Sequence, residues 1–365
     1  MNVLFVTQFS SVGGSSRVQI LQFLPYFDRA GIVYTHIAIY SDNFYHIQNR
    51  MRSVSRIRRD GNFLLGIIAA YIKKCMIAWQ APSYDTVVIQ REVFPRILYW
   101  ILRQRNPRII YEIEDTIYEL NAFWEDGIVR SFGLRYQARL CRNMMRHAAH
   151  IIVENEYHAA EARTYGHDVS FITAPIDTGR VHPGPSHDSS TVTLGWIGGT
   201  PTTALLEQLQ PVFRAIGTRF PQAQLLTVGA ALQFRAKGIP HEHLPWSEES
   251  EVALLQRMDI GLMPLDDAPF NKGRLGYKMI QYMSVGIPIV ADHIGLNSTV
   301  VRDGENGFLV SSEAEWIEKI GMLILDRGLR ERMGKAGWNI AEERYAITRQ
   351  AENFIRTVQY VGKQK

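Results

Sequence analysis

The sequence predicts an α/β protein made of two Rossmann-like, doubly wound parallel-sheet domains. The chain has 365 residues, of which 46% are apolar, so it is long enough for two domains that each bury a core. Short apolar runs rich in β-branched residues alternate with longer segments of helical period, which is typical of βαβ units. A stretch rich in Pro, Gly and small polar residues, 173–191, separates the two halves as a linker.

The first half contains five expected strands with helices between them. Apolar, β-branched runs predict strands at the following segments: 2–8, 34–40, 86–90, 108–114 and 150–155. Helical periodicity predicts helices near the following segments: 17–29, 62–80, 93–105 and 130–148. This half forms an N-terminal domain, expected at 1–180.

The same alternation restarts after the linker. Strand-like runs are expected at 193–199, at QLLTVGA, at 259–265 and at 287–292, and the segment 303–310 places a turn before a short strand. Helices are expected from the first of these runs to about 219 and near 274–285, and a polar loop follows QLLTVGA. The chain is helical from 313 onward, and a last helix is expected at roughly 339–360. We expect a C-terminal domain at 181–340 and a segment 341–365 that packs back toward the N-terminal domain. Two such domains in tandem predict a central cleft, with ligands beyond the carboxyl ends of the strands.

The charge and the cysteines exclude several classes of protein. Residues 1–185 hold 21 Lys and Arg against 16 Asp and Glu (+5), and the rest holds 19 against 20 (−1). This excess is modest, and no nucleic-acid-binding module accompanies it, so we expect no nucleic-acid partner. Cys75 and Cys141 form no CxxC pair, which excludes a zinc ribbon and a disulfide framework and fits a reducing cytosol.

Two apolar segments have the composition of possible targeting or membrane sequences. The first 14 residues lack a basic leader and a small-residue cleavage site, and their pattern indicates a buried strand. The apolar run 63–72 is about half the length of roughly 20 residues that a spanning helix needs, and Lys73 and Lys74 interrupt its continuation. We therefore predict no membrane span.

A glycine pair lies between the first strand and the first helix. Gly13 and Gly14 allow a ligand to approach the backbone closely, and the free N–H groups of the following helix favour an anion. The pair lacks the GxGxxG spacing, so a simple tight turn between strand and helix explains it equally well.

A denser group of cations occurs before a helix in the second half. Lys272, Arg274 and Lys278 surround Gly273 and Gly276 at the expected helix start. Basic residues oppose the helix dipole at this end, so their placement indicates a bound anion such as a diphosphate.

Gln281 lies three residues after Lys278 on the same helical face. Its amide could hydrogen-bond a ribose hydroxyl. The alternative is an inward-facing polar residue that caps a loop.

With these motifs the sequence resembles glycosyltransferase family 4, whose members are retaining enzymes of the GT-B fold. It especially resembles a subgroup with a basic-Gly-basic loop and a QYM helix. The resemblance extends over nearly the whole chain, in matching order and spacing. It is carried by the following segments: the GG loop with SSRVQILQFLPYF, VVIQREVFP (87–95), YEIEDTIY (111–118), IIVEN, 174–179, GWIGGTPTT (195–203), GYKMIQYMSVGIPIVA, GLN and DGENGFLV.

The resemblance implies roles for the residues that match the motifs of the family. The Gly13–Gly14 loop would lie against the donor diphosphate, with Arg17 nearby, in a domain that binds the acceptor. The three cations of the second domain would hold the diphosphate and stabilise the departing nucleotide. Gln281 falls where many relatives have the second of two glutamates, which holds the ribose.

The resemblance also places the sugar and the nucleobase. Glu114 and Asp115 end a strand where many relatives have a His-Asp pair that faces the donor sugar. Pro245 and Trp246 fall near the loop that receives the base. Both carboxylates are candidates for orienting a hydroxyl or supporting proton transfer, and the alternative is a pair that caps the next segment.

Two departures from the family pattern put the identity of the sugar in doubt. Gly273 replaces the first glutamate, which contacts the sugar. The Arg and Lys that often follow the GWIGG-like strand are absent, since 200–203 read TPTT. We interpret these as a displaced phosphate clamp.

The implied reaction is transfer of a sugar from a nucleoside-diphosphate sugar, UDP or GDP, to an acceptor hydroxyl with retention. A basic clamp lowers its barrier electrostatically, and no other cofactor is expected. Neither HEH (241–243) nor LDD (265–267) has convincing metal geometry, so no metal is predicted. The acceptor would be a glycan, a lipid-linked molecule or a small molecule.

The basic surplus of the first half has one further interpretation. Five arginines lie in 50–59, before the apolar run, and others recur at 130, 135, 139, 142 and 146. Such a surface can bind an anionic leaflet, which predicts a cytoplasmic protein with peripheral contact to the inner face of the membrane. The alternative is an ordinary solvated helix face.

Three other functions stay open at this stage. A nucleotide-sugar epimerase of the GT-B fold would need acid and base groups on both sides of a sugar carbon. Gly273 and the missing Arg-Lys pair make a catalytically silent partner protein conceivable. A dinucleotide oxidoreductase is the weakest alternative because the GxGxxG fingerprint is absent.

Overall fold

The computed structural model describes residues 1–49, 56–119, 128–184, 190–268, 271, 273–274 and 276–364. The chain divides into two compact units, and each has its own sheet and core. Unit 1 comprises Met1–Pro175 and Thr348–Lys365, and unit 2 comprises Ile176–Ile347. The boundary therefore lies between 175 and 176, inside the expected linker, and the C-terminal segment enters unit 1 at 348.

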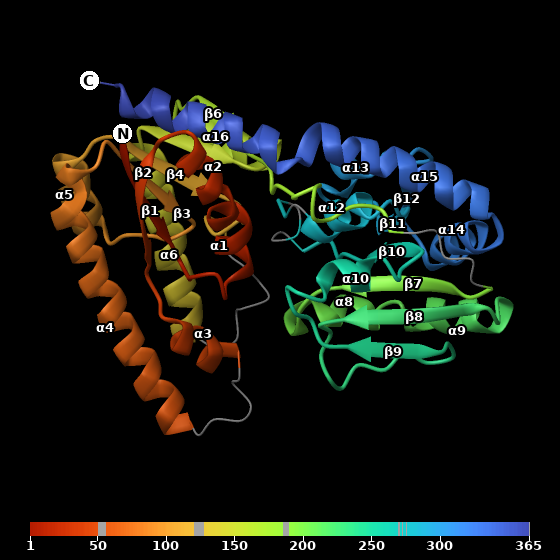
Figure 1. Ribbon diagram of the computed structural model, residues 1–365. Helices are drawn as coiled ribbons and strands as arrows, with labels where there is room; N and C mark the ends of the chain where they lie inside the picture. The colour runs from red at the N-terminus through yellow and green to blue at the C-terminus, as the bar shows by residue number, and fades with distance from the viewer. Residues whose placement is uncertain are drawn as a thin grey trace. The chain divides into compact units, whose positions relative to one another are not determined.

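Unit 1 is built on a six-stranded sheet in the order β2-β1-β3-β4-β5-β6 with every pair parallel (Figure 1). Its strands are β1 (Asn2–Thr7), β2 (Val33–Ala38), β3 (Thr86–Gln90), β4 (Ile109–Ile113), β5 (His150–Val153) and β6 (Val169–Phe171). The central strands are buried on both faces, which is why they appear in the sequence as continuous apolar runs.

Helices cover both faces of this sheet. They are α1 (Gly14–Gln19), α2 (Leu24–Arg29), α3 (Asp42–Asn49), α4 (Arg56–Gln80), α5 (Arg96–Arg105), α6 (Ile128–His147), α7 (Glu156–Arg163) and α16 (Ile347–Gly362). On one face, Val87, Ile89 and Tyr111 join the core with α4 to α7. On the other face, the Phe5 ring packs edge-on against Phe27 of α2 and Phe354 of α16, so the end of the chain completes the core of unit 1.

Unit 2 contains a second parallel sheet, in the order β12-β11-β10-β7-β8-β9 (Figure 1). Its strands are β7 (Val192–Ile197), β8 (Ala223–Val228), β9 (His241–Leu244), β10 (Ile260–Met263), β11 (Ile289–Asp292) and β12 (Gly307–Val310). Its helices are α8 (Thr203–Glu207), α9 (Gln210–Arg219), α10 (Glu251–Leu255), α12 (Tyr277–Ser284), α13 (Asn297–Val300), α14 (Glu313–Leu325) and α15 (Arg327–Ile340).

Three expectations about local structure were wrong. The strands β6 and β9 are absent from the sequence prediction, because both lie at sheet edges and their side chains are only partly buried. The helix expected at 339–360 is interrupted, because Ile176 forms a bridge with Ala346. The amide of Ile176 donates to the carbonyl of Tyr345 and the amide of Ile347 donates to the carbonyl of Ile176, so these backbone groups leave the helix.

One helix bears on the prediction of no membrane span. In the part of the chain that the structure describes, the segment Asn62–Ser83 is long and apolar enough to cross a membrane by length and composition, with a mean hydropathy of 1.4 over its best window. The sequence prediction stopped at Lys73, but the helix continues past both lysines. One side of it packs in the core through Ala70, Ile77 and Ala78.

Candidate functional site

Each unit gathers its polar residues at the carboxyl edge of its sheet. In unit 1 the strand order reverses between β1 and β3, and in unit 2 it reverses between β7 and β10. Ligands of open parallel sheets bind at such reversals, because the loops diverge there and leave backbone groups exposed. The site of unit 2 lies at its reversal, and the site of unit 1 lies beside its reversal, at the ends of β4 and β5 with contacts to Ser15 and Gln90.

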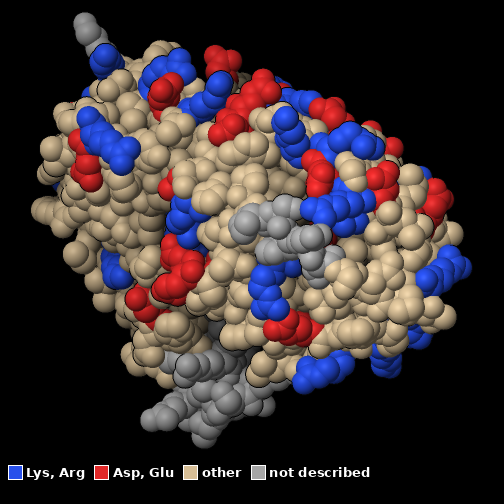
Figure 2. Space-filling model, turned by 45° about the vertical axis from the view of Figure 1, so that its right-hand side comes forward, with Lys and Arg blue, Asp and Glu red and all other residues tan. Residues whose placement is uncertain are grey.

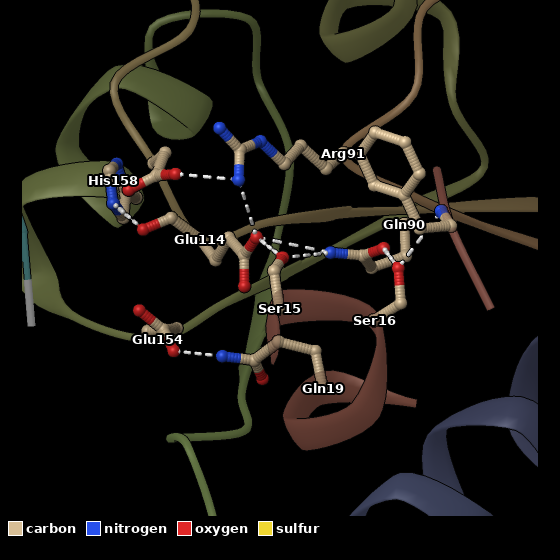
Figure 3. Close-up of polar contacts among 10 residues, drawn as sticks. Ser15, Ser16, Gln19, Gln90, Arg91, Glu114, Glu154 and His158 are labelled. Carbon is tan, nitrogen blue, oxygen red and sulfur yellow. Dashed lines mark hydrogen bonds and ion pairs between the residues drawn. The ribbon is translucent and has the colours of Figure 1, made fainter. Parts of the chain in front are cut away.

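The site of unit 1 is a cluster of carboxylates at the ends of β4 and β5, and we call it the acidic cluster: Glu112, Glu114, Asp115 and Glu154. Figure 3 shows Glu114 and Glu154 with their hydrogen-bond partners. Glu114 is its best-connected member and is 7% exposed. Its Oε1 accepts hydrogen bonds from the Ser15 hydroxyl and from Gln90 Nε2, the latter at 3.1 Å. Glu114 is therefore held from two neighbouring strand ends.

Arg91 pairs with two of these carboxylates. Its Nη1 lies 3.3 Å from Glu114 Oε1 and 3.0 Å from Asp115 Oδ2. The residue has φ +59°, a left-handed conformation that costs a non-glycine residue roughly 1–2 kcal/mol. Its amide donates to the Glu112 carbonyl at 3.0 Å, and this bond holds the turn that aims the guanidinium at the cluster.

Burial sets the protonation of the acidic cluster. Desolvation raises the pKa of Glu114 to about 7, with Arg91 opposing the shift and Asp115 adding to it. The pKa of Glu112 is raised well above its ordinary value, first by burial and then by Glu114, and neither of its carboxyl oxygens has a hydrogen-bond partner. Burial therefore favours the protonated form of Glu112, and Glu114 titrates near pH 7.

Neighbouring helices fix the edges of the cluster. Gln19 of α1 donates to Glu154 Oε1. The His158 ring of α7 lies 3.0 Å from the Glu114 carbonyl and 3.0 Å from the Tyr118 hydroxyl. These contacts join four segments around Glu114 and prepare its position before any ligand arrives.

The glycine pair opens α1, which carries two of these contacts. Gly13 is buried, and a Cβ there would lie 2.7 Å from Phe9 Cβ, so the tight turn by itself requires a glycine. At Gly14 a Cβ would meet open space. Arg17 is half-buried, and its Nη1 donates to the Ser11 carbonyl at 3.4 Å.

The site of unit 2 centres on Lys278, in the first turn of α12. Its Nζ lies 4.4 Å from the ring centroid of Trp196, a side chain of β7 that is completely buried and whose indole N–H has no hydrogen-bond partner. Burial, and then the charge of Arg274, lower the pKa of Lys278 to about 7. Arg274 contributes to this shift through its charge, and the binding of a diphosphate by the pair stays a prediction.

Only part of the expected basic clamp lies inside the helix. α12 begins at Tyr277, so Arg274 precedes it, and Lys272 lies outside the described residues. Gly276 stands at the N-cap, where a Cβ would lie 2.6 Å from Met263 Cε, and no side chain caps the helix there. The close packing accounts for this glycine, and a ligand-binding role for it stays a prediction.

Tyr282 anchors α12 to the sheet at the strand reversal. Its hydroxyl accepts from the Ile197 amide at 3.1 Å and donates to the Leu262 carbonyl at 3.3 Å. Gln281 precedes it, one turn after Lys278, and is 5% exposed. The helix that carries Lys278 and Gln281 is therefore fixed to both β7 and β10.

Trp246 follows β9 at the same edge. Its indole nitrogen donates to Glu251 Oε2 at 2.7 Å, and 38% of the residue is exposed. Gly229, with φ +74°, brings this region against β7, because a Cβ there would lie 2.5 Å from the Gly198 carbonyl and 3.1 Å from Trp246 Cβ. Trp246 thus presents a partly open aromatic surface close to the end of β7.

Several residues of these sites were not assigned a role from the sequence. They are Ser15, Gln19, Gln90, Arg91, Glu112, Glu154 and His158 in unit 1, and Trp196 and Tyr282 in unit 2. A signal existed for some, because Gln90, Arg91 and Glu154 end or directly follow buried strands of a parallel sheet. No signal in the sequence brings His158 to Glu114.

Metal binding finds no support among the residues that can be described. No group of three His, Cys, Asp or Glu side chains is placed to hold an ion there. His241 and His243 of the HEH segment both hydrogen-bond the Thr227 hydroxyl, at 2.9 and 3.2 Å.

The two sites have complementary chemistry. The site of unit 2 offers cations and an aromatic face, which suits a phosphate group and a base. The acidic cluster offers a preorganised carboxylate that titrates near neutrality, which suits a hydroxyl group. The roles of the individual residues in binding stay predictions.

Comparison with known proteins agrees with the chemistry of unit 2. Residues 192–326, which include Trp196, Trp246, Lys278 and Gln281, match the family described as Glycosyl transferases group 1. Spore coat protein SA of Bacillus subtilis (strain 168) is 32% identical over 76 residues, which is 20% of each chain. The match thus spans about a fifth of that relative's length.

Solved structures resemble the chain over its whole length. HepE of Anabaena in complex with UDP-glucose matches with a TM-score of 0.68 and 17% identity, over 99% of this chain and 100% of that chain. Sucrose-phosphate synthase of Thermosynechococcus elongatus matches with a TM-score of 0.69 and 14% identity, over 99% and 98%. The two parallel six-stranded sheets with their helices have the GT-B two-domain α/β fold, which confirms the expected fold class.

Proposed function

We propose that this protein is a retaining, metal-independent glycosyltransferase that moves a sugar from a nucleoside-diphosphate sugar to an acceptor hydroxyl. The observation that carries the proposal is the position of Lys278 beside Arg274 at the start of α12, on the carboxyl edge of its sheet. This pair belongs to the segment that matches Glycosyl transferases group 1. The cleft expected between the two domains stays a prediction.

The cations would act on the leaving group. Breaking the bond between sugar and diphosphate places negative charge on the phosphate, and a fixed cation stabilises that charge more than it stabilises the bound donor. Lys278 has a lowered pKa because its charge is desolvated without a ligand. A bound diphosphate would restore the charged form, so donor binding itself completes the catalytic state.

The acidic cluster would act on the acceptor. Glu114 can accept a hydrogen bond from an acceptor hydroxyl and orient it, and Arg91 holds the carboxylate in place through its guanidinium. In the same-face mechanism that we propose, the acceptor oxygen forms the new bond to the anomeric carbon while the old bond to the phosphate breaks. The hydroxyl proton passes to the departing phosphate, and no nucleophile from the protein is needed.

We propose UDP-sugars as the first donors to test. HepE, whose structure was solved with UDP-glucose, shares the fold of this chain. Trp246 would stack against the base and Gln281 would hydrogen-bond the ribose, while Lys272, Gly13, Gly14 and Arg17 would complete the diphosphate site. The acceptor class is a glycan, a lipid-linked molecule or a small molecule of polysaccharide or glycoconjugate synthesis, and the proposed location is the cytoplasm.

The test measures nucleotide release with a panel of UDP- and GDP-sugars, each with and without an acceptor. We expect release from one donor that depends on the acceptor, and a product with the anomeric configuration of the donor. Lys278→Met should reduce kcat/KM by about 10²- to 10³-fold, the usual cost of removing one group that stabilises the transition state. Lys319→Met is the matched control, because Lys319 is a lysine of unit 2 on α14 that pairs with Glu318.

Other outcomes would replace the proposal with a different function. Nucleotide release or a change in the sugar without any acceptor would indicate an epimerase. Nucleotide binding without turnover of any donor would indicate a silent partner protein. Full turnover by Lys278→Met would show that the clamp is assigned to the wrong residue.

A further inference from the structure

We propose that the outer face of α4 and α5 is a docking surface for an anionic lipid bilayer, on which the protein lies without crossing it. Apolar side chains cover these helices where a globular protein normally exposes polar ones. The main members of this docking face are Leu64, Ile68, Ile72, Trp79, Ile97 and Trp100. Ile97 is 76% exposed and Trp79 is 74% exposed.

The apolar residues follow one stripe along α4. Leu64, Ile68 and Ile72 are spaced four residues apart, so their side chains lie above one another on the helix surface. Cys75 and Trp79 continue the same line, and both are exposed. α5 packs beside α4 and extends the surface sideways through Ile97 and Trp100. A contiguous patch of this kind marks an interaction site.

The opposite side of α4 holds the helix in unit 1. Lys74 Nζ lies 2.6 Å from Glu92 Oε1 and donates to the Val93 carbonyl at 2.8 Å, and this ion pair is buried. Lys73 donates to the Ala38 carbonyl at 2.6 Å. Ile77 and Ala78 lie in the core beside them. α4 therefore has the length of a membrane span but is packed against one face of the sheet, so only its outer stripe can meet lipid.

The charge around the docking face selects the kind of membrane. α5, α6 and the part of α4 from Asn62 contain no Asp or Glu, whereas α5 carries three arginines and α6 carries exposed arginines at 135, 139, 142 and 146. By contrast, basic and acidic side chains are mixed on the face drawn in Figure 2. Two copies of a basic surface would repel each other, whereas an anionic leaflet attracts it.

Aromatic side chains give the surface the character of a membrane interface. Trp79, Trp100 and Tyr71 are exposed on these helices, and such rings favour the headgroup level. The guanidinium of Arg105 stacks 4.8 Å from the centroid of the Trp79 ring and donates to the Trp79 carbonyl. This contact fixes the tryptophan at the rim, with a cation beside it for a lipid phosphate.

The test is co-flotation of the full chain with vesicles, with no donor or acceptor present. We expect binding to vesicles of equal parts phosphatidylcholine and phosphatidylglycerol, and weak binding to phosphatidylcholine alone. Ile68→Asp with Ile72→Asp should reduce the partition coefficient by at least about tenfold, because two aliphatic side chains that the bilayer would bury are lost. Arg135→Glu and Arg139→Glu should reduce it by about fivefold each. The control, Leu232→Asp with Leu325→Asp, changes two exposed leucines of unit 2 and should bind normally.

A second measurement reports the depth of the docking face. Cys75 is exposed and Cys141 is buried, so a thiol-reactive, polarity-sensitive fluorophore labels Cys75 selectively. Its emission should shift to the blue when anionic vesicles are added, and should not shift in the Ile68→Asp, Ile72→Asp variant. Because no substrate is involved, the outcome is independent of the proposed glycosyl transfer.

Three results would overturn the proposal. The first is equal binding of wild type and of the Ile68→Asp, Ile72→Asp variant, with unchanged unfolding midpoints. The second is absence of wild-type binding to anionic vesicles. The third is a dimer in solution that this double substitution converts to a monomer, which would assign the face to a second copy of the chain.

Discussion

The acidic cluster of unit 1 and the cationic site of unit 2 both lie at the carboxyl edge of a parallel six-stranded sheet but carry side chains of opposite charge. Glu114 is buried and contacts Ser15 and Gln90 beside one strand reversal, and Lys278 is half-buried in the helix that follows β10 at the other. Burial raises the pKa of Glu114 to about 7 and lowers the pKa of Lys278 to about 7. Desolvation disfavours the charged form of either group, so it raises the pKa of the acid and lowers the pKa of the base.

The two sites differ in how they hold these groups. Glu114 accepts hydrogen bonds from Ser15, Gln90 and Arg91, so its position is fixed by the protein. Lys278 lies over the face of Trp196, a contact that gives less direction than a hydrogen bond. The site of unit 1 is therefore preorganised, whereas the site of unit 2 is suited to acquire its charge from a ligand.

The largest expected effect tests the preorganised side. Glu114→Gln keeps the shape of the side chain but loses the charge that orients the acceptor hydroxyl, so kcat should fall by about 10²-fold, the usual cost of a misplaced reacting group. UDP affinity should stay unchanged, because the substitution lies in the other unit. Wild-type kcat should rise through a pKa near 7, and this rise should be absent in the variant. Steady-state kinetics from pH 5 to 9 measure both.

Glu156→Gln is the matched control for Glu114→Gln. Glu156 is a carboxylate of α7 that pairs with Arg163 on the surface, so its loss should not change kcat. A kcat for Glu114→Gln within twofold of wild type would show that the acidic cluster is structural.

A smaller effect tests whether the ligand supplies the charge in unit 2. Lys278 is partly neutral above pH 7, and a bound diphosphate raises its pKa, so binding takes up a proton. UDP affinity should therefore fall by about tenfold between pH 7 and pH 9 in titration calorimetry. Lys278→Arg should remove the dependence, because a guanidinium stays charged. An unchanged pH dependence in Lys278→Arg would contradict this assignment.

The third expected effect is on the free energy of unfolding, which each group changes over a different range of pH. The folded pKa of Glu114 is raised, so its contribution to stability is present below its unfolded pKa near 4.5 and is lost as the pH rises through about 7. The folded pKa of Lys278 is lowered, so its contribution is present above 10.5 and is lost as the pH falls through about 7. At pH 7 Glu114 lowers the free energy of unfolding by roughly 3 kcal/mol and Lys278 lowers it by roughly 4 kcal/mol.

Urea unfolding at several pH values measures how each group changes the free energy of unfolding. Glu114→Gln should flatten the loss of stability between pH 4.5 and 7, and Lys278→Met should flatten the gain between pH 7 and 10.5. Each variant should be more stable than wild type at pH 7. If both variants were destabilised there by more than about 1 kcal/mol, the two groups would contribute to packing and not to a strained charge.

The secondary structure was predictable where burial is complete. β3 and β4 consist of residues buried on both faces, and such strands read as continuous apolar runs. β9 has the sequence HEHL and lies at a sheet edge, so no apolar run marks it. The break before α16 depends on a bridge between Ile176 and Ala346, which are far apart in sequence, and no local pattern reveals it.

The residues of the candidate sites also differ in whether a local sequence pattern indicates them. Lys278 and Arg274 lie four residues apart in sequence, and their unusual place near a helix start predicts them as site residues. Glu114 and Asp115 were found from the resemblance to a family and from their place after a strand. Arg91 was missed, because its partners lie on the next strand and only pairing of β3 with β4 brings them together.

The sequence by itself determined that the chain forms two α/β domains and that cations gather before one helix, because periodicity and local charge are properties of neighbouring residues. Tertiary structure alone decided that Glu114 and Lys278 both titrate near pH 7, since desolvation depends on atoms from distant segments. It also decided that the apolar run of α4 faces outward on one side and joins the core on the other. Burial is a long-range property, and it is burial that gives these residues their chemistry.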